Sequence, residues 1–106
     1  MINVNEIVKD IHTNAVEHGW WDNERSFGEV IALCHSELSE ALEADRAGEP
    51  DLYFNGNKPE GVAVEMIDCV IRIFDWCGHA GIDVEGIIKT KHNYNVTRPY
   101  KHGKKY

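Results

Sequence analysis

The 106-residue sequence has few prolines, few cysteines and no long hydrophobic run. No apolar segment approaches the roughly 20 residues that a bilayer-spanning helix needs, and no charged-then-apolar leader opens the chain. We therefore expect a cytoplasmic protein that does not insert into a membrane. The three cysteines form no CxxC pair and lie among apolar residues, so we expect them to be reduced, buried thiols.

Basic residues are also in short supply. Eleven lysines and arginines stand against eighteen aspartates and glutamates, and the formal net charge is -7. Non-specific binding to nucleic acid requires a net basic surface, because it depends on displacing counterions from phosphates. We therefore expect no nucleic-acid partner, and a polyanionic small molecule would need metal ions to approach. The basic exception is the tail from about residue 99 to 106, which ends in KHGKKY.

Length and composition indicate a single folded domain that covers residues 1–106. The chain is 42% hydrophobic and 27% charged, which is ordinary for a globular protein, and it contains no repeat or low-complexity tract. A domain of this size buries only a modest core, because its surface is large relative to its volume. We therefore expect more than one copy of the chain to associate.

Helical periodicity predicts an all-α chain with four helices, at about residues 4–18, 26–47, 60–79 and 83–95. The sequence SFGE at Ser26 is a capping box for the second helix, and Asp83 is the predicted N-cap of the fourth. Segment 48–59 is rich in turn-forming residues and is expected to be a loop, mobile or acting as a lid. No segment shows a convincing strand-like alternation of apolar and polar residues.

Two acidic pairs lie beside the apolar stripes of the second and third predicted helices. Glu37 falls inside the apolar arc of the second helix, and Glu40 falls at its edge. The third helix is apolar nearly all round, which predicts that it is buried, and Glu65 and Asp68 share its narrow polar stripe. Buried carboxylates are costly unless they are paired or bound to a metal. A hard divalent cation such as Mg²⁺, which favours carboxylate oxygens, would neutralise them.

Two other interpretations of these acids exist. The polar stripe could simply be solvated, with Arg72 paired to Asp68 at i,i+4 and to Asp75 at i,i+3. Glu37 and Glu40 would then lie at the rim of the core. A carboxylate-bridged di-iron bundle would need Glu-x-x-His, and no glutamate in this sequence has a histidine three residues on, so that interpretation fails.

The pattern Glu37-x-x-Glu40 followed by Glu65-x-x-Asp68 resembles the metal signature of the MazG-like all-α nucleoside triphosphate pyrophosphohydrolases. The resemblance covers roughly residues 19–105, including ELSEALEADR, VAVEMIDCVIRI and KHNYNVTRPYKHGKKY. It implies a four-helix MazG-like bundle completed by oligomerisation, as a homodimer or homotetramer. The sequence departs from many members at Ser36, where they have a further glutamate.

The resemblance also implies a reaction, in which a ribo- or deoxyribonucleoside triphosphate is cleaved between its α and β phosphates to a monophosphate and pyrophosphate. The implied ligands of Mg²⁺, for which Mn²⁺ could substitute, are Glu37, Glu40, Glu65 and Asp68. Lys91, Asn95 and Arg98 match the family's late basic and amide positions, which hold phosphate and sugar. A carboxylate not fully occupied by metal would take the proton of the attacking water, and Glu40 is favoured for this role. Helix geometry adds Arg72 as a phosphate contact.

Aromatic residues supply the remaining candidates. Trp20 and Trp21 precede the second helix and either stack on a base or close the end of the bundle, and Trp21 is the predicted substrate contact. His35 and Tyr53 are further candidates for the pocket. The alternative function is a non-catalytic helical oligomeric module that binds nucleotide or a protein partner. Loss of a metal-binding acid would mark that alternative, whereas all four acids are present.

Overall fold

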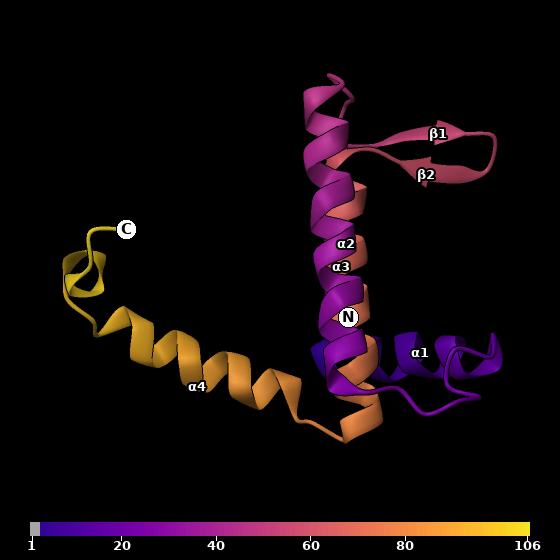
Figure 1. Cartoon of the computed structure of the whole chain (residues 1–106). Coiled ribbons are helices and arrows are strands. Elements are labelled where there is room, and N and C mark those ends of the chain that lie inside the picture. The colour runs from indigo at the N-terminus through magenta and orange to yellow at the C-terminus, as the bar shows by residue number, and fades with distance from the viewer. Residues whose placement is uncertain (1–2) are drawn as a thin grey trace.

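The computed structural model describes residues 3–106, which form a mostly helical small domain with a β-hairpin (Figure 1). Its elements are α1 (Val4–Glu17), α2 (Phe27–Arg46), β1 (Tyr53–Asn55), β2 (Lys58–Glu60), α3 (Val62–Ala80), α4 (Val84–Val96) and the 3₁₀ helix η1 (Tyr100–Gly103). The prediction of four α-helices is confirmed, and each observed boundary lies within two residues of the predicted one. Among the residues described, no helix combines the length and apolar character needed to cross a membrane.

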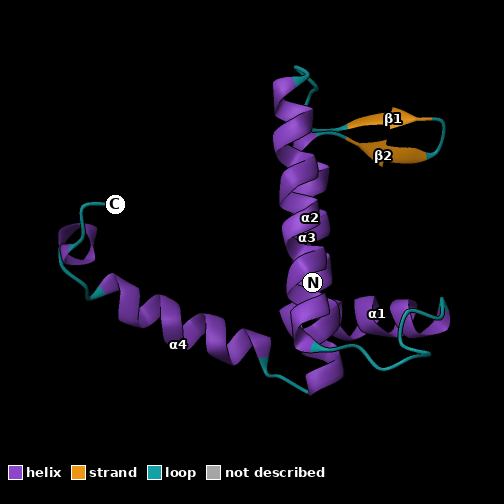
Figure 2. Cartoon of the chain, in the orientation of Figure 1, coloured by secondary structure: helices purple, strands orange, loops and turns teal. Residues whose placement is uncertain are grey.

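The β-hairpin corrects the expectation of a strand-free chain (Figure 2). It lies in the segment predicted to be a loop, with Tyr53 opposite Glu60 and Asn55 opposite Lys58 in an antiparallel register. Each strand has only three residues, which is too short for a period-2 pattern to stand out in the sequence. The hairpin projects sideways from the α2–α3 pair (Figure 1).

The predicted caps account for where α2 and α4 begin. The hydroxyl of Ser26 accepts a hydrogen bond from the backbone amide of Glu29 at 3.1 Å. The carboxylate of Asp83 accepts one from the amide of Gly86 at 3.0 Å. Each bond satisfies an amide that has no partner inside its own helix, so both helix starts are stabilised by residues next to them in the sequence.

Gly61 lies at a close approach between the hairpin and the start of α3. Its φ of 130° is a backbone conformation that side chains rarely permit, and a Cβ there would lie 2.5 Å from the carbonyl oxygens of Pro50 and Asp51. The amides of Val62 and Ala63 donate to these same carbonyls at 3.0 Å and 3.1 Å. The first turn of α3 is therefore tied to the chain that leaves α2.

The two long helices, α2 and α3, pack side by side in opposite directions, and α1 packs across the end of α3 (Figure 1). The core consists of two small clusters, Val8–Cys77–Val84 and Val30–Cys34–Cys69, and Trp76 packs against both. The three cysteines are buried and form no disulfide, as predicted. Burial raises the pKa of the Cys34 and Cys77 thiols. Both thiols therefore pack as small hydrophobic groups of the core.

The prediction that α3 is buried all round is wrong for the single chain. Met66, Ile67 and Ile73 remain 49%, 54% and 43% exposed, because α2 and α1 cover only part of its circumference. On α2, helical spacing gathers an exposed apolar stripe of Phe27, Ile31, Leu38 and Leu42. The radius of gyration is 16.3 Å, against about 13 Å for a compact domain of this length. The single chain therefore leaves much apolar surface uncovered.

The fourth helix, α4, projects away from the α2–α3 pair (Figure 1). Its beginning is held in place, because Val84 is buried against Val8 and Cys77. The side chain of Asn5 also donates to Asp83 at 2.9 Å and accepts from the amide of Glu85 at 3.0 Å. Farther along, the exposed apolar side chains are Ile87, Ile88, Tyr94 and Val96.

Candidate metal centre and adjoining pocket

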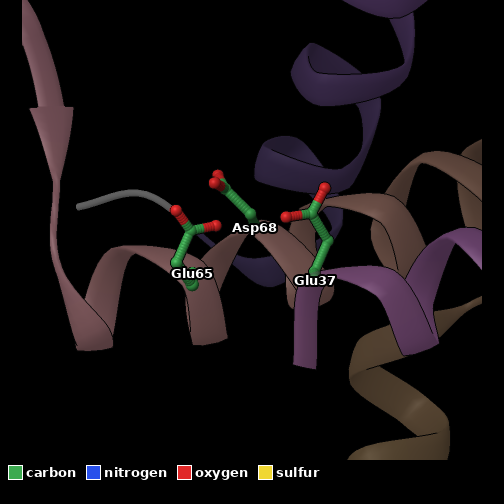
Figure 3. A group of neighbouring side chains, drawn as sticks. All are labelled: Glu37, Glu65 and Asp68. Carbon is green, nitrogen blue, oxygen red and sulfur yellow. The ribbon is translucent and has the colours of Figure 1, made fainter. Parts of the chain in front are cut away.

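Three carboxylates from α2 and α3 converge on one point (Figure 3). Glu37, Glu65 and Asp68 each offer an oxygen atom, and these atoms lie within 4.8 Å of one another. The spacing of three residues places Glu65 and Asp68 on neighbouring turns of one face of α3, and the packing of α2 brings Glu37 beside them. Glu37 is buried, whereas the two acids of α3 are half-buried.

This cluster of acids is short of positive charge. Burial and the neighbouring carboxyl group of Glu40 raise the pKa of Glu65 to about 7. Burial and the negative charge of Glu37 also raise the pKa of Asp68. Burial alone would raise the pKa of Glu37 as well, but its hydrogen bonds, led by the one from Arg72, hold that pKa below its ordinary value. A cation at this point would favour the charged form of Glu65, which burial and the neighbouring carboxyl groups disfavour.

Arg72 pairs with α2 rather than with the acids of its own helix. Its Nε donates to Glu37 Oε1 at 2.7 Å. The pairs expected for a solvated stripe, Arg72 with Asp68 and Arg72 with Asp75, are absent from the hydrogen bonds and ion pairs of residues 3–106. The reason is that Arg72 lies on the side of α3 that faces α2, where Glu37 is within reach. A single arginine therefore serves the buried acid and leaves Glu65 and Asp68 without a salt bridge.

Glu40 lies next to this group but not within it. Its side chain is exposed, and its carboxyl group is one of the causes, after burial, of the raised pKa of Glu65. Together they line a second pocket of about 300 Å³, beside the base of the hairpin. There the hydroxyl of Tyr53 donates to the carboxylate of Glu49, which raises the pKa of Tyr53 to about 12. Tyr53, a predicted pocket residue, lines this second pocket, and its hydroxyl is engaged by Glu49.

The main pocket has a volume of about 470 Å³ and is lined by two of the three acids, Glu37 and Asp68. Its α2 and α3 side includes Glu37, Asp68 and Arg72, and its other side comes from α1 and the connector between α1 and α2. The residues on that second side are Asp10, Ile11, Asn14, Ala15, Trp20 and Arg25. Carboxylates, two guanidinium groups and an aromatic ring therefore surround one space large enough for a small molecule.

Trp20, and not the predicted Trp21, is the tryptophan that lines this pocket. The Trp21 ring is stacked on His79 with a centroid separation of 4.0 Å, and its Nε1 donates to Asp75 at 2.9 Å. Trp21 therefore matches the second interpretation, in which the ring closes the end of the bundle. Trp20 is 60% exposed, and the guanidinium of Arg25 lies 5.5 Å from its ring centroid.

A buried network centred on Asp75 has no signature in the sequence. Its carboxylate bonds His12 Nδ1 at 2.8 Å as well as the indole of Trp21, and it is only 8% exposed. These contacts join α1, the connector and α3. His12 is 63 residues from Asp75 in the chain, so no local spacing could indicate the pair. The network fixes the position of the α1 side of the pocket.

Three predicted substrate contacts lie apart from the pocket within one chain. Lys91, Asn95 and Arg98 belong to α4 and the residues that follow it, and none of them lines the pocket that residues 3–106 form. The Lys91 and Arg98 cations lie over the Tyr94 ring, 5.1 Å and 5.3 Å from its centroid. The side-chain oxygen of Asn95 is enclosed without a hydrogen-bond donor among the described residues. His35, a further candidate, is exposed on α2.

Comparisons of this chain with models of protein families, with curated proteins and with solved structures found no match. The donor atoms of the site themselves indicate which metal ion it would bind. Oxygens on opposite sides of a bound Mg²⁺ are about 4.2 Å apart, since each bond is about 2.1 Å long. The carboxylates of Glu37, Glu65 and Asp68, all within 4.8 Å of one another, would need only a small movement to bind one. Their hard oxygen atoms suit Mg²⁺ or Mn²⁺ better than softer metals.

Proposed function

We propose that this protein is a Mg²⁺-dependent nucleotide pyrophosphohydrolase of the MazG-like type. It would cleave a ribo- or deoxyribonucleoside triphosphate between the α and β phosphates to a monophosphate and pyrophosphate. The observation that carries the proposal is the convergence of Glu37, Glu65 and Asp68 beside a pocket of about 470 Å³. That volume lies within the range of small-molecule sites. The resemblance of the two acidic pairs to the family's metal signature supports this particular reaction.

The three converging acids would hold the metal ion. When bound, Mg²⁺ neutralises polyphosphate charge and lowers the pKa of a coordinated water. Glu65 must lose its proton before it can act as a ligand, and its pKa of about 7 places that loss near neutral pH. Glu40 is exposed and adjacent to Glu65, so its carboxylate is accessible as an additional ligand or as the acceptor of a proton from water.

Arg72 is suited to contact phosphate. Its Nε is used by Glu37, but its two terminal nitrogens have no hydrogen-bond partner in residues 3–106. These nitrogens carry donors that match phosphate oxygens in charge and geometry. The ion pair with Glu37 holds the guanidinium at the edge of the main pocket, because both residues line it. Arg72 would therefore orient the triphosphate beside the acids.

The base would lie on the opposite side of the pocket. Trp20 offers a largely exposed aromatic face, and flat bases stack on such faces. The guanidinium carbon of Arg25 lies 5.5 Å from the ring centroid of Trp20 and 5.3 Å from that of Trp21. This contact holds the two tryptophan rings from one side. Asp10 and Asn14 line the same space and could hydrogen-bond to the edge of a base. Trp20 thus takes the role that the sequence suggested for Trp21.

The test is to measure pyrophosphate and monophosphate released from a panel of ribo- and deoxyribonucleoside triphosphates, with Mg²⁺ and with chelator. We expect metal-dependent pyrophosphate, reduced on the order of 100-fold in Glu65→Gln, because the metal supplies several kcal/mol of charge stabilisation. Glu17→Gln is the matched control, since that carboxylate is exposed on α1 and lines neither of the two pockets described. Release of orthophosphate, or no product at all, would contradict the proposal. Mg²⁺-dependent nucleotide binding without turnover would instead favour a non-catalytic binding module.

A further inference from the structure

Two side chains of opposite charge face the main pocket without a partner. Asp10 of α1 and Arg25 of the connector both line this space. Within residues 3–106, neither side chain forms a hydrogen bond or an ion pair, and the two do not pair with each other. Pockets for small molecules use a few polar groups of this kind to fix the orientation of a ligand. The pocket therefore suits a ligand with hydrogen-bond acceptors at one edge and donors at another.

A flat ring system is the shape that this side of the pocket favours. Trp20 is 60% exposed, and the guanidinium carbon of Arg25 lies 5.5 Å from its ring centroid. The α1 wall adds Ile11 and Ala15, which are apolar and four residues apart, as are Asp10 and Asn14. A base that stacks on Trp20 would thus have a guanidinium within reach, with the Asp10 carboxylate in the same space.

The hydrogen-bonding groups of the two charged side chains differ in kind. The guanidinium of Arg25 carries only donors, arranged as a rigid fork, whereas the ionised carboxylate of Asp10 has only acceptors. Guanine matches both. Its O6 and N7 form an adjacent pair of acceptors, which arginine recognises with two hydrogen bonds, and its N1–H and 2-amino group form an adjacent pair of donors.

The other common bases match one of these side chains at most. Adenine has an amino group in place of O6, so a donor of the base would face the donors of Arg25. Uracil and thymine have a single N–H between two carbonyl groups, and those carbonyl oxygens would face the carboxylate of Asp10. Cytosine has its amino group and its two acceptors on one edge of a single ring, so it cannot present them at separate edges to the two side chains.

We infer that the main pocket is selective for guanine nucleotides. Asp10 accepts hydrogen bonds from N1–H and the 2-amino group of the base, Arg25 donates to O6 and N7, and Trp20 stacks on the ring. This assignment rests on the proposed function for the presence of a nucleotide, and it adds the identity of the base. It concerns only the base, so ribo- and deoxyribonucleotides are recognised alike.

Binding of nucleoside monophosphates in the presence of Mg²⁺ tests this selectivity, because they contain no bond that the proposed reaction cleaves. Isothermal titration calorimetry should show guanosine monophosphate binding at least about tenfold more tightly than the adenosine, cytidine and uridine monophosphates. Inosine monophosphate lacks only the 2-amino group and should bind about 10–100-fold more weakly, the usual effect of one hydrogen bond to a charged group. Equal affinities for guanosine and inosine monophosphates would overturn the assignment of Asp10.

A reversal of selectivity separates recognition from damage to the fold. Asp10→Asn gives a carboxamide with one acceptor and one donor, which matches xanthine, because xanthine has a carbonyl group where guanine has the 2-amino group. We expect this variant to bind xanthosine monophosphate more tightly than guanosine monophosphate, whereas a variant that merely misfolds would lose both. Glu17→Gln makes the same change at an exposed position on α1 outside the pocket and should keep the preference for guanine. An unchanged preference in Asp10→Asn would overturn the inference.

The contact of Arg25 is tested with 7-deazaguanosine monophosphate, which lacks the N7 acceptor. We expect it to bind the wild type about tenfold more weakly than guanosine monophosphate, and to bind Arg25→Lys about equally, because lysine has no fork to span O6 and N7. Arg25→Lys keeps the positive charge, so a phosphate contact of Arg25 would instead leave the effect of removing N7 equal in both proteins. That equality would overturn the assignment of Arg25.

Failure of guanine selectivity and failure of the proposed function give different results. If all nucleoside triphosphates release pyrophosphate at equal rates and all monophosphates bind equally, the selectivity is wrong and the proposed function stands. If no triphosphate is hydrolysed, yet guanosine monophosphate binds preferentially and Asp10→Asn reverses the preference, the proposed function is wrong and the selectivity stands.

Discussion

Ionisation of Glu65 should destabilise the metal-free protein as the pH rises. Burial and Glu40 raise the pKa of this carboxyl group from an ordinary 4.5 to about 7. A carboxyl group with a higher pKa in the folded state binds its proton more tightly there than in the unfolded chain. Its contribution to stability is therefore complete below about pH 4.5 and is lost as the pH rises through 7.

The size of this loss follows from the shift in pKa. One pKa unit corresponds to about 1.36 kcal/mol, so the difference between 4.5 and about 7 sets an upper limit of about 3.4 kcal/mol. Glu65 is only half-buried, and solvent screens part of the repulsion. We therefore expect the free energy of unfolding to fall by about 1–2 kcal/mol between pH 5 and pH 8.

Urea unfolding at pH 5, 6, 7 and 8 measures this fall, with chelator present and the protein concentration held constant because association also affects stability. Glu65→Gln should remove most of the fall, whereas Glu17→Gln, an exposed acid on α1, should keep it. Adding Mg²⁺ at pH 8 should restore stability to the wild type more than to Glu65→Gln. The reasoning is refuted if the wild type and Glu65→Gln lose stability equally over this pH range.

Three further substitutions test contacts around the site by urea unfolding. Gly61→Ala should lower the free energy of unfolding by about 2–4 kcal/mol, because its Cβ would lie 2.5 Å from two carbonyl oxygens and its φ is 130°. A decrease below about 1 kcal/mol, which is on the order of an ordinary surface substitution, would contradict the close approach. Arg72→Met should cost about 2 kcal/mol, since it removes the donor from the buried Glu37 carboxylate. The double variant with Glu37→Gln should recover part of that loss. Asp75→Asn should lower the free energy of unfolding by about 1–2 kcal/mol and shift the tryptophan fluorescence, because Trp21 donates to this carboxylate. Unchanged fluorescence would contradict the hydrogen bond between Trp21 and Asp75.

The helices could be predicted because their determinants are local. Ser26 and Asp83 cap helices through bonds to amides three residues away, and those partners are always near in sequence. The β-hairpin was missed because its three-residue strands show no alternation and depend on pairing with each other. The predicted burial of α3 failed for a related reason. Apolar periodicity shows which side chains favour burial but not whether one chain supplies enough surface to cover them.

The cluster of Glu37, Glu65 and Asp68 could be predicted in part, because two of its members are near one another in the sequence. Spacing of three residues puts Glu65 and Asp68 on one face of α3 whatever else the fold does. The partner of Arg72 was not predictable from the sequence. Arg72 pairs with Glu37, 35 residues away, rather than with the acids on its own helix, because the packing of α2 brings Glu37 within reach. The contacts that hold Trp21 away from the main pocket, which Trp20 lines instead, are with His79 and Asp75, and only the folded chain brings these residues to the connector.

By itself the sequence determined the four helices, their caps, the acidic pairs and the basic tail of about residues 99–106. These features depend on residue spacing within a few turns of helix or on composition, so they hold before the chain folds. The tertiary structure decided that Glu37 joins Glu65 and Asp68, that Asp75 ties α1 to α3, and that α4 projects away from the α2–α3 pair. These contacts depend on packing between distant segments, because residues far apart in the sequence come within reach of one another only when the helices pack together.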